Sequence, residues 1–310
     1  MKFFKYPSIE EHYQKKFLYH ILRTLPKDTQ FYITEKIHGA NFAIYISQDE
    51  IKFASRNEFL GDKEFFDYKE VVSKYQDCFD IIQQAVQGDE YYIMYGEIFG
   101  GNVQKECYYK DQQDFVCFDI AIVKDDMVKF LDMSDCIKKC SLLCLPYLPV
   151  LFSGTLHECL KYNNTFITTL NLEKGTECEG VIIRPDKDCY ISSGSRIILK
   201  SKNAIFSEKR GTKHRELKGG IDNIEQISHE LFDHINENRI NSFISKIGDD
   251  LEMKLFSTYL KEIYEDCLND YKKEYGDTTI SKDVNRIAMS KIAILLKRFI
   301  DVKKFYLNKI

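Results

Sequence analysis

Nine residues near the start of the chain read Thr34-Glu35-Lys36-Ile37-His38-Gly39-Ala40-Asn41-Phe42. They lie within a run of β-branched and aromatic residues from Phe31 to Ile46, a composition typical of β-strands. The glycine predicts a turn at His38-Gly39-Ala40, so the run should form two strands that meet there. Lys36 would then end the first strand, beside a glycine that lets backbone approach a ligand closely.

A lysine in this position can attack phosphorus only after it loses its proton. The pKa of a free lysine is about 10.4, and a shift of about 3 units toward neutrality costs about 4 kcal/mol. One cation about 4 Å away, at an effective dielectric constant of about 20, supplies roughly that energy. The chain offers Lys200 and Lys202, which are one residue apart on an expected strand and so face the same side. Without these neighbouring cations, the simplest interpretation of Lys36 is a surface lysine on a strand.

The remaining chain has the patterns of a mixed α+β protein followed by a helical one. Ser8 and Glu11 have the spacing of a capping box, which predicts an opening helix that Pro26 ends. Toward the C-terminus only helical periodicity is left. We therefore expect a first domain over residues 1–215 and a small all-α domain over residues 221–310. Further strands are expected at 51–55, 91–95, 115–122, 180–184 and 196–200, and helices at about 65–87, 134–143, 224–247, 251–271 and 281–304.

The charge of the chain excludes a generally basic nucleic-acid-binding protein. Its 310 residues carry 44 Lys and Arg against 48 Asp and Glu, a formal net charge of −4. Any contact with a polyanion must therefore come from local patches. One such patch, from Lys200 to Lys218, has seven basic residues against two acidic ones. Taken by itself, this patch is better explained as a solvated linker. Trp is absent, so stacking on a base would fall to the 20 Tyr and 22 Phe residues.

The ten cysteines raise the question of disulfides or zinc. No signal peptide opens the sequence, which favours a reducing compartment. Cys136, Cys140 and Cys144 recur every four residues and so share one helical face, where core thiols are a simpler interpretation than zinc ligands. The uncharged stretch around residues 142–152 is too short to span a bilayer. We expect an intracellular, cytoplasmic protein that contacts no membrane.

Six segments carry a stronger signal, because they occur in a fixed order. Neither a P-loop nor a dinucleotide-binding fingerprint is present. In kind and order the segments resemble the motifs of the ATP-dependent polynucleotide ligases, within the covalent nucleotidyltransferase superfamily that also contains the mRNA capping enzymes. They resemble most of all the RNA ligase 2 family, which seals nicks in double-stranded RNA. The segments are Glu35-Lys36-Ile37-His38-Gly39, Ala54-Ser55-Arg56, Tyr95-Gly96-Glu97, Phe118-Asp119, Glu179-Gly180-Val181-Ile182-Ile183-Arg184-Pro185 and Ile197-Ile198-Leu199-Lys200-Ser201-Lys202.

The resemblance implies an α+β fold, with an ATP-grasp-like nucleotidyltransferase domain of antiparallel sheets and flanking helices. It implies that Lys36 attacks the α-phosphorus of ATP and holds AMP as a phosphoramidate. Arg56 and Glu97 would bind the ribose, Phe118 would stack on adenine, and Asn41 would lie near the α-phosphate or the incoming 3′-hydroxyl. The residues expected to contact ATP are Glu35, Ile37, His38, Asn41, Arg56, Glu97, Phe118, Lys200 and Lys202.

The same resemblance implies a metal ion and charged groups around the phosphates. Glu179 and Asp119 would bind magnesium, or manganese in its place, because a hard cation takes oxygen ligands. Lys200 and Lys202 would neutralise the α-phosphate and its transition state. His38, which stands where DNA ligases and capping enzymes usually have Asp, would contact a phosphate or orient the pyrophosphate.

The expected partner is a nicked double-stranded RNA or an RNA-splinted duplex. Phe65 and Phe66 would contact it beside the nick, and Arg239 would contact it from the helical domain. Residues Lys209 to Lys218 would form a phosphate-binding hinge. Because duplex RNA is recognised by its A-form shape, no base specificity is expected. The protein would act as a monomer, with an end-healing kinase or phosphatase as a partner.

Two other functions fit part of the pattern. A GTP-dependent capping guanylyltransferase is disfavoured by His38 and by the absence of a recognisable barrel domain after Lys202. A catalytically idle RNA-binding relative is disfavoured because binding alone does not need a lysine nucleophile. The abundance of Ile, Lys, Tyr and Phe with only 5 Pro is typical of an AT-rich genome, such as that of a virus.

Overall fold

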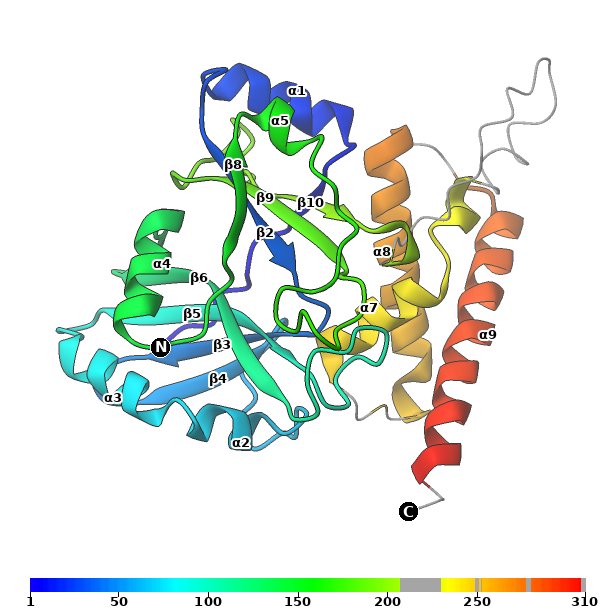
Figure 1. Cartoon of the computed structure of the whole chain (residues 1–310). Coiled ribbons are helices and arrows are strands. Elements are labelled where there is room, and N and C mark those ends of the chain that lie inside the picture. The colour runs from blue at the N-terminus through cyan, green and yellow to red at the C-terminus, as the bar shows by residue number, and fades with distance from the viewer. Residues whose placement is uncertain (207–229, 249–250, 252, 277–279, 308–310) are drawn as a thin grey trace. The chain divides into compact units, whose positions relative to one another are not determined.

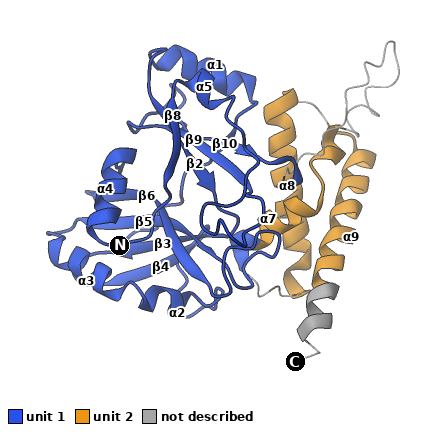
Figure 2. Ribbon diagram, viewed as in Figure 1, with its two compact units in different colours: residues 1–205, 245–249 blue, residues 206–244, 250–310 orange. Residues whose placement is uncertain are grey.

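The computed structural model describes residues 1–206, 230–248, 251, 253–276 and 280–307. The chain divides into two compact units (Figure 2): unit 1 comprises residues 1–205 and 245–249, and unit 2 comprises residues 206–244 and 250–310. The predicted domain boundary between 215 and 221 lies outside the described residues. So does the predicted phosphate-binding hinge from Lys209 to Lys218.

Unit 1 is built on two five-stranded sheets (Figure 1). Sheet A has the order β1-β10-β9-β2-β8, and all of its strand pairs are antiparallel except the parallel pair of β1 and β10. Its strands are β1 (Glu10–Glu11), β10 (Leu199–Lys202), β9 (Gly180–Pro185), β2 (Phe31–Lys36) and β8 (Val150–Gly154).

Sheet B has the order β4-β3-β5-β6-β7 and is antiparallel throughout. The turn at Gly39 connects the two sheets, since β2 belongs to sheet A and β3 to sheet B. Antiparallel sheets with flanking helices confirm the predicted α+β class. The strands of sheet B are β4 (Ile51–Ser55), β3 (Ala40–Ile46), β5 (Tyr91–Phe99), β6 (Asp114–Lys124) and β7 (Met127–Phe130).

Helices cover the outer face of each sheet. On sheet B, one hydrophobic cluster joins alternate strand residues such as Phe42 and Ile44 to Phe79 and Cys140 of the helices. On sheet A, a second cluster joins Ile33 and its neighbours to α1 and α5. The helices of unit 1 are α1 (Lys15–Thr24), α2 (Tyr68–Ser73), α3 (Gln76–Ala85), α4 (Met133–Leu142) and α5 (Leu156–Cys159).

The predicted capping box at Ser8 and Glu11 is wrong. Residues Glu10–Glu11 form β1, and the first helix begins only at Lys15. The backbone of this segment pairs with β10, and the Glu11 carboxylate lies 3.2 Å from Lys200 Nζ. These contacts with a strand distant in the sequence outweigh the local capping preference. The predicted helix end before Pro26 is confirmed, because α1 ends at Thr24.

The described part of unit 2 is helical, which confirms the predicted all-α character of the C-terminal region. In α8 the buried residues recur every four positions, from Tyr259 to Tyr271, and α9 has the same spacing from Val284 to Ile300. The helices η2 (Met253–Leu255), α8 (Phe256–Tyr275) and α9 (Lys282–Leu307) belong to unit 2. The helices η1 (Ala204–Phe206) and α7 (Glu237–Ile247) each have residues in both units.

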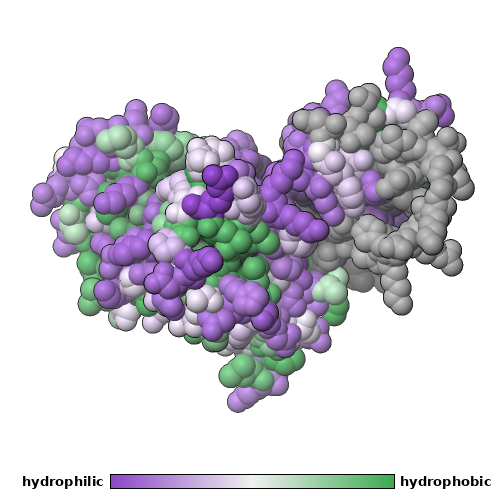
Figure 3. All heavy atoms as spheres, turned by 90° about the horizontal axis from the view of Figure 1, so that it is seen from above, coloured by the Kyte–Doolittle hydropathy of each residue, from purple (hydrophilic) through white to green (hydrophobic). Residues whose placement is uncertain are grey.

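The surface mixes polar and apolar residues. On the face drawn in Figure 3, hydrophobic residues gather in the middle of unit 1 with hydrophilic ones around them. Among the described residues, no helix combines the length and the hydrophobicity that crossing a bilayer would require.

Candidate active site

Three strands of sheet A bring two lysines to the same place. Lys36, the last residue of β2, pairs with Gly180 of β9, and Gly180 pairs in turn with Lys202 of β10. Residues that lie directly opposite each other in a sheet point to the same face. A Cβ on Gly180 would come within 2.2 Å of the Ser201 carbonyl oxygen. Only glycine therefore lets β9 and β10 come together at this point.

The Glu179 carboxylate lies between these two lysines. Its Oε2 is 2.7 Å from Lys36 Nζ, and its Oε1 is 3.1 Å from Lys202 Nζ. Burial opposes the charged carboxylate, but Lys36 and Lys202 outweigh it and hold the pKa of Glu179 well below its ordinary value. Glu179 is therefore an ionised, buried carboxylate. Lys200 faces Glu11 instead, so only one of the two predicted cations accompanies Lys36 at Glu179.

His38 connects this cluster to the loop between β5 and β6. Its backbone N–H donates to the Tyr109 hydroxyl at 2.8 Å. Its ring lies between two carboxylates, with Nδ1 3.3 Å from Glu179 and Nε2 3.3 Å from Glu106. Burial would lower the pKa of His38, but the hydrogen bonds to Glu106 and Glu179 reverse this and raise it. Glu106 and Tyr109 belong to no motif, and no spacing in the sequence singled them out.

The turn after His38 places the next predicted residues on sheet B. A Cβ on Gly39 would lie 2.3 Å from the Ile98 carbonyl oxygen, so the turn requires glycine. Asn41 of β3 pairs with Glu97 of β5. Burial raises the pKa of Glu97 to about 7, although the charges of Lys36, His38 and Arg56 pull it down. Because the charge of Arg56 acts on the Glu97 carboxyl, Arg56 belongs to the same group of site residues.

Phe118 occupies a β-bulge. Tyr95 pairs with Asp119 and Gly96 pairs with Cys117, so Phe118 is an extra residue on β6 with no partner on β5. A bulge turns a side chain away from the regular alternation of a strand. The half-buried ring meets Tyr6 edge to face, with the ring centroids 5.1 Å apart. The ring is thus only partly covered by the protein, and its stacking on adenine remains a prediction.

The structure does not support Asp119 as a metal ligand. Its carboxylate is fully buried, and its Oδ2 lies 2.5 Å from Arg196 and 3.0 Å from Arg184. The Tyr6 hydroxyl donates to the same oxygen at 2.8 Å. Burial opposes ionisation, but Arg184 and Arg196 lower the pKa of Asp119. Two guanidinium groups already neutralise this carboxylate. Asp119 instead links β6 to Tyr6 of the N-terminal segment.

The side chains on either side of Lys36 point into the protein. Glu35 is fully buried and accepts hydrogen bonds from the backbone N–H and the hydroxyl of Thr169, at 2.7 and 2.6 Å. Ile37 is also buried. Because side chains alternate along a strand, this orientation leaves Lys36 pointing to the opposite side from Glu35. Any contact of Glu35 or Ile37 with a nucleotide would come from the backbone.

The segment that contains most of these residues matches a known protein family. Residues 29–202 match the family model of the RNA ligases. The chain belongs to the RNA ligase family. Residues 219–295 match the family model of the T4 RNA ligase 2 C-terminal domain. The predicted likeness to RNA ligase 2 is thereby confirmed.

Individual relatives of this RNA ligase family member are distant. Protein Early 65 kDa of Autographa californica nuclear polyhedrosis virus is 24% identical over 171 residues, which cover 51% of this chain and 28% of that protein. A mutant RNA ligase of Naegleria gruberi with ATP and Mn is 17% identical with a TM-score of 0.50, over 66% of this chain and 58% of that one. Another mutant of it, with AMP and Mn, is 16% identical with the same TM-score and coverage.

These structural matches confirm the nucleotidyltransferase fold, and at such low identity they bear on the fold alone. The chain spans just over half the length of the solved structures, 58%, and a smaller share of the viral protein, 28%.

Two of the predicted RNA contacts in this RNA ligase family chain are buried. Phe65 is 1% exposed and stacks in the core 6.2 Å from the ring of Phe42. Arg239 is 5% exposed, and its guanidinium lies 2.8 Å from Asp270. The structure thus contradicts direct RNA contact by these two side chains, because neither reaches solvent. Phe66 is half-buried and has a positive φ of 48°, and its contact with RNA remains a prediction.

Proposed function

We propose that this chain is an ATP-dependent RNA ligase that seals 3′-hydroxyl/5′-phosphate nicks in double-stranded RNA. The reaction would pass through a lysyl-AMP on Lys36 and an RNA-adenylate. The observation that carries the proposal is the cluster of Lys36, Glu179 and Lys202, within the segment that matches the RNA ligase family. The ATP found with the Naegleria gruberi RNA ligase supports ATP as the nucleotide.

In the first step Lys36 Nζ attacks the α-phosphorus of ATP, a P–N bond forms, and pyrophosphate leaves. The amine must be neutral at that moment, so its proton has to leave before or during the attack. The ammonium of Lys202 would neutralise the α-phosphate as charge builds up on it. His38 would also contact a phosphate. Its Nδ1 lies 3.3 Å from Glu179 Oε2.

The nucleoside would lie over sheet B. Phe118, freed from strand pairing by its bulge, would stack on adenine. Arg56 would donate to the ribose hydroxyls and Glu97 would accept from them. Asn41 pairs with Glu97 in the sheet and would lie between the ribose and the phosphates.

Glu179 fits a divalent cation. Its carboxylate is buried and ionised, and unlike the arginines at Asp119, its partner Lys36 would give up its proton and this ion pair in the first step, which leaves an oxygen for a metal ion. Magnesium in nucleotide sites takes one or two carboxylates together with phosphate oxygens and waters. Magnesium or manganese held there would supply positive charge beside the α-phosphate. The Mn in the Naegleria gruberi RNA ligase structures supports this assignment. Asp119 is left out of it.

In the later steps AMP passes from Lys36 to an RNA 5′-phosphate, and a 3′-hydroxyl then attacks that phosphorus and releases AMP. The match of residues 219–295 to the T4 RNA ligase 2 C-terminal domain supports a second module that engages RNA. We propose that the protein acts as a monomer on ends prepared by a kinase or phosphatase. The baculovirus relative supports a viral origin.

A sealing assay tests the proposal. Nicked RNA duplex, nicked DNA duplex and single-stranded RNA are each incubated with the full chain, ATP and magnesium. We expect the nicked RNA duplex to be joined best, and Lys36→Ala to join nothing. Lys63→Ala, at an exposed lysine outside the site, is the matched control and should keep full activity. Binding without joining by the wild type would identify an idle RNA-binding relative, and labelling with GTP instead of ATP would favour a capping guanylyltransferase.

A further inference from the structure

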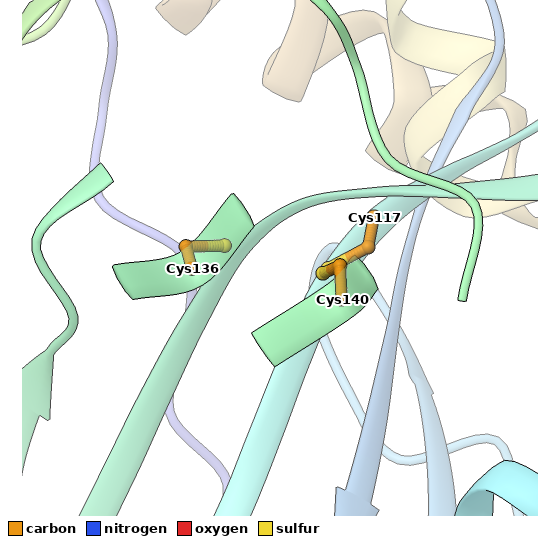
Figure 4. A group of neighbouring side chains, drawn as sticks. All are labelled: Cys117, Cys136 and Cys140. Carbon is orange, nitrogen blue, oxygen red and sulfur yellow. The ribbon is translucent and has the colours of Figure 1, made fainter. Parts of the chain in front are cut away.

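Three buried thiols converge beside the bulge that holds Phe118. Cys117 lies on β6, and Cys136 and Cys140 lie on α4 (Figure 4). Their sulfur atoms all lie within 4.8 Å of one another. The exposed fractions of the three residues are 0%, 4% and 0%. Within the described residues, no other set of three or more His, Cys, Asp or Glu side chains converges in this way.

The arrangement depends on both elements. Cys136 and Cys140 are four residues apart and so share the face of α4 that turns toward sheet B. Cys117 comes directly before the bulged residue, and its N–H donates to the Pro146 carbonyl in the segment after α4. Free cysteines also pack in cores as small hydrophobic residues, so the convergence of the three sulfur atoms, and not their burial, points to a ligand set.

The chemistry of three close thiols is that of a soft metal ligand set. Metal–thiolate bonds of about 2.3 Å place the sulfurs of one site about 4 Å apart, close to the spacing found here. Thiolates select thiophilic ions such as Cu⁺ and Zn²⁺ over hard cations. We propose that Cys117, Cys136 and Cys140 together bind one thiophilic metal ion as three thiolates. Binding releases three protons, one from each thiol, and involves no change in oxidation state.

The number of ligands bears on which ion fits. Cu⁺ would be satisfied by three ligands in a dry site, whereas Zn²⁺ almost always takes a fourth.

A metal ion here would fasten α4 to β6 next to Phe118. If Phe118 stacks on adenine, as in the proposed function, the site would hold the stacking ring in place. That consequence rests on the proposed function, but the metal site itself does not. Metal content is therefore the primary measurement, and the affinity for ATP is secondary.

The full chain is purified without chelator from cells supplied with zinc and, separately, with copper, and its metal content is measured by mass spectrometry. We expect one ion per chain, with the two arms deciding between Zn²⁺ and Cu⁺. Cys136→Ala and Cys140→Ala should each lose it. Cys159→Ala, at an equally buried thiol of α5, is the matched control and should keep it. Wild type without an ion, or variants that retain as much ion as wild type, would overturn the proposal.

A second measurement avoids the risk that a variant fails to fold. Wild-type chain is titrated with a mercurial reagent while released metal is followed with a colour indicator. We expect release to follow the modification of three thiols. Modification of all ten cysteines with no ion released would likewise overturn the proposal.

Discussion

The ammonium of Lys36 lies 2.7 Å from the Glu179 carboxylate, although the two residues are 143 positions apart in the sequence. Attack on phosphorus needs the free electron pair of Lys36 Nζ, so this ion pair must break before lysyl-AMP can form. The same carboxylate is also the best candidate to hold a divalent cation. The ion pair therefore engages both groups, and it must open before Lys36 attacks phosphorus or Glu179 Oε2 holds a metal ion.

Replacing Glu179 should slow lysyl-AMP formation and change its dependence on magnesium. Glu179→Gln keeps the shape but removes the charge, and we expect lysyl-AMP formation to fall by about 100-fold or more, since a buried electrostatic contact to the transition state is worth about 3 kcal/mol. The conservative variant Glu179→Asp should regain part of the rate at raised magnesium. Rates of AMP transfer from labelled ATP, measured over a series of magnesium concentrations, give the answer. A Glu179→Gln rate equal to wild type would remove Glu179 from the metal site.

Gly180 should be intolerant of a side chain. A methyl group at this position meets the Ser201 carbonyl at 2.2 Å, so Gly180→Ala should separate β9 from β10 and move Lys202 away from Glu179. Gly194→Ala is the matched control, because Gly194 also has a positive φ but nothing lies within 4 Å of its added Cβ. We expect Gly194→Ala to lose only about 1–2 kcal/mol of stability, the cost of a Cβ in the left-handed region. Lysyl-AMP formation and urea unfolding of both variants test the difference. Equal behaviour of the two would contradict the packing argument.

Phe118 should govern the affinity for ATP. Stacking of a base on an aromatic ring is worth about 1–3 kcal/mol, so Phe118→Ala should raise the ATP concentration needed for half-maximal adenylylation about 5- to 150-fold. Phe118→Tyr keeps the ring and should remain near wild type. Adenylylation measured against ATP concentration distinguishes the two variants. Similar losses in both would point to a packing role for this residue.

Asp119 should matter for stability and not for magnesium. Asp119→Asn leaves Arg184 and Arg196 without their buried counterion, and breaking such a contact costs about 3–5 kcal/mol. The magnesium dependence of the remaining folded protein should be unchanged. Denaturant unfolding and magnesium titration of adenylylation test the two parts. A large shift in magnesium dependence with little loss of stability would return Asp119 to the metal site.

Glu97 should make stability depend on pH. Its pKa in the folded chain is about 7 against an ordinary value of 4.5, so the folded state holds a proton that the unfolded state has lost between these values. The free energy of unfolding should therefore fall as pH rises from about 4.5 to 7, and Glu97→Gln should remove that part of the fall. Urea unfolding of both proteins at several pH values is the measurement. Parallel pH profiles for the two would show that this carboxyl titrates normally.

Much of the site could be predicted because its signals are local. The glycine turn, the strand composition around Lys36 and the ordered motifs placed the lysine, Glu179 and Lys202 correctly in one region. Glu11, which pairs with Lys200, could not be predicted, because the parallel pairing of β1 with β10 joins segments far apart in the sequence.

The family resemblance led to wrong predictions at two kinds of position. Asp119 is acidic and lies beside Phe118, yet the strand turns it toward two arginines. Phe65 and Arg239 were expected to contact RNA from the family resemblance, but local sequence does not reveal that each packs against a partner inside the protein, Phe42 for one and Asp270 for the other. Strand β8 was missed because prolines precede its short apolar run.

The central claim is that Lys36 carries AMP covalently. The most direct test incubates the full chain with ATP and magnesium, without RNA, and maps the modified residue by mass spectrometry of its peptides. We predict one added AMP, on the peptide that contains Lys36, through an acid-labile P–N bond. AMP found on another residue, or an unmodified chain under conditions where RNA is nevertheless joined, would contradict it.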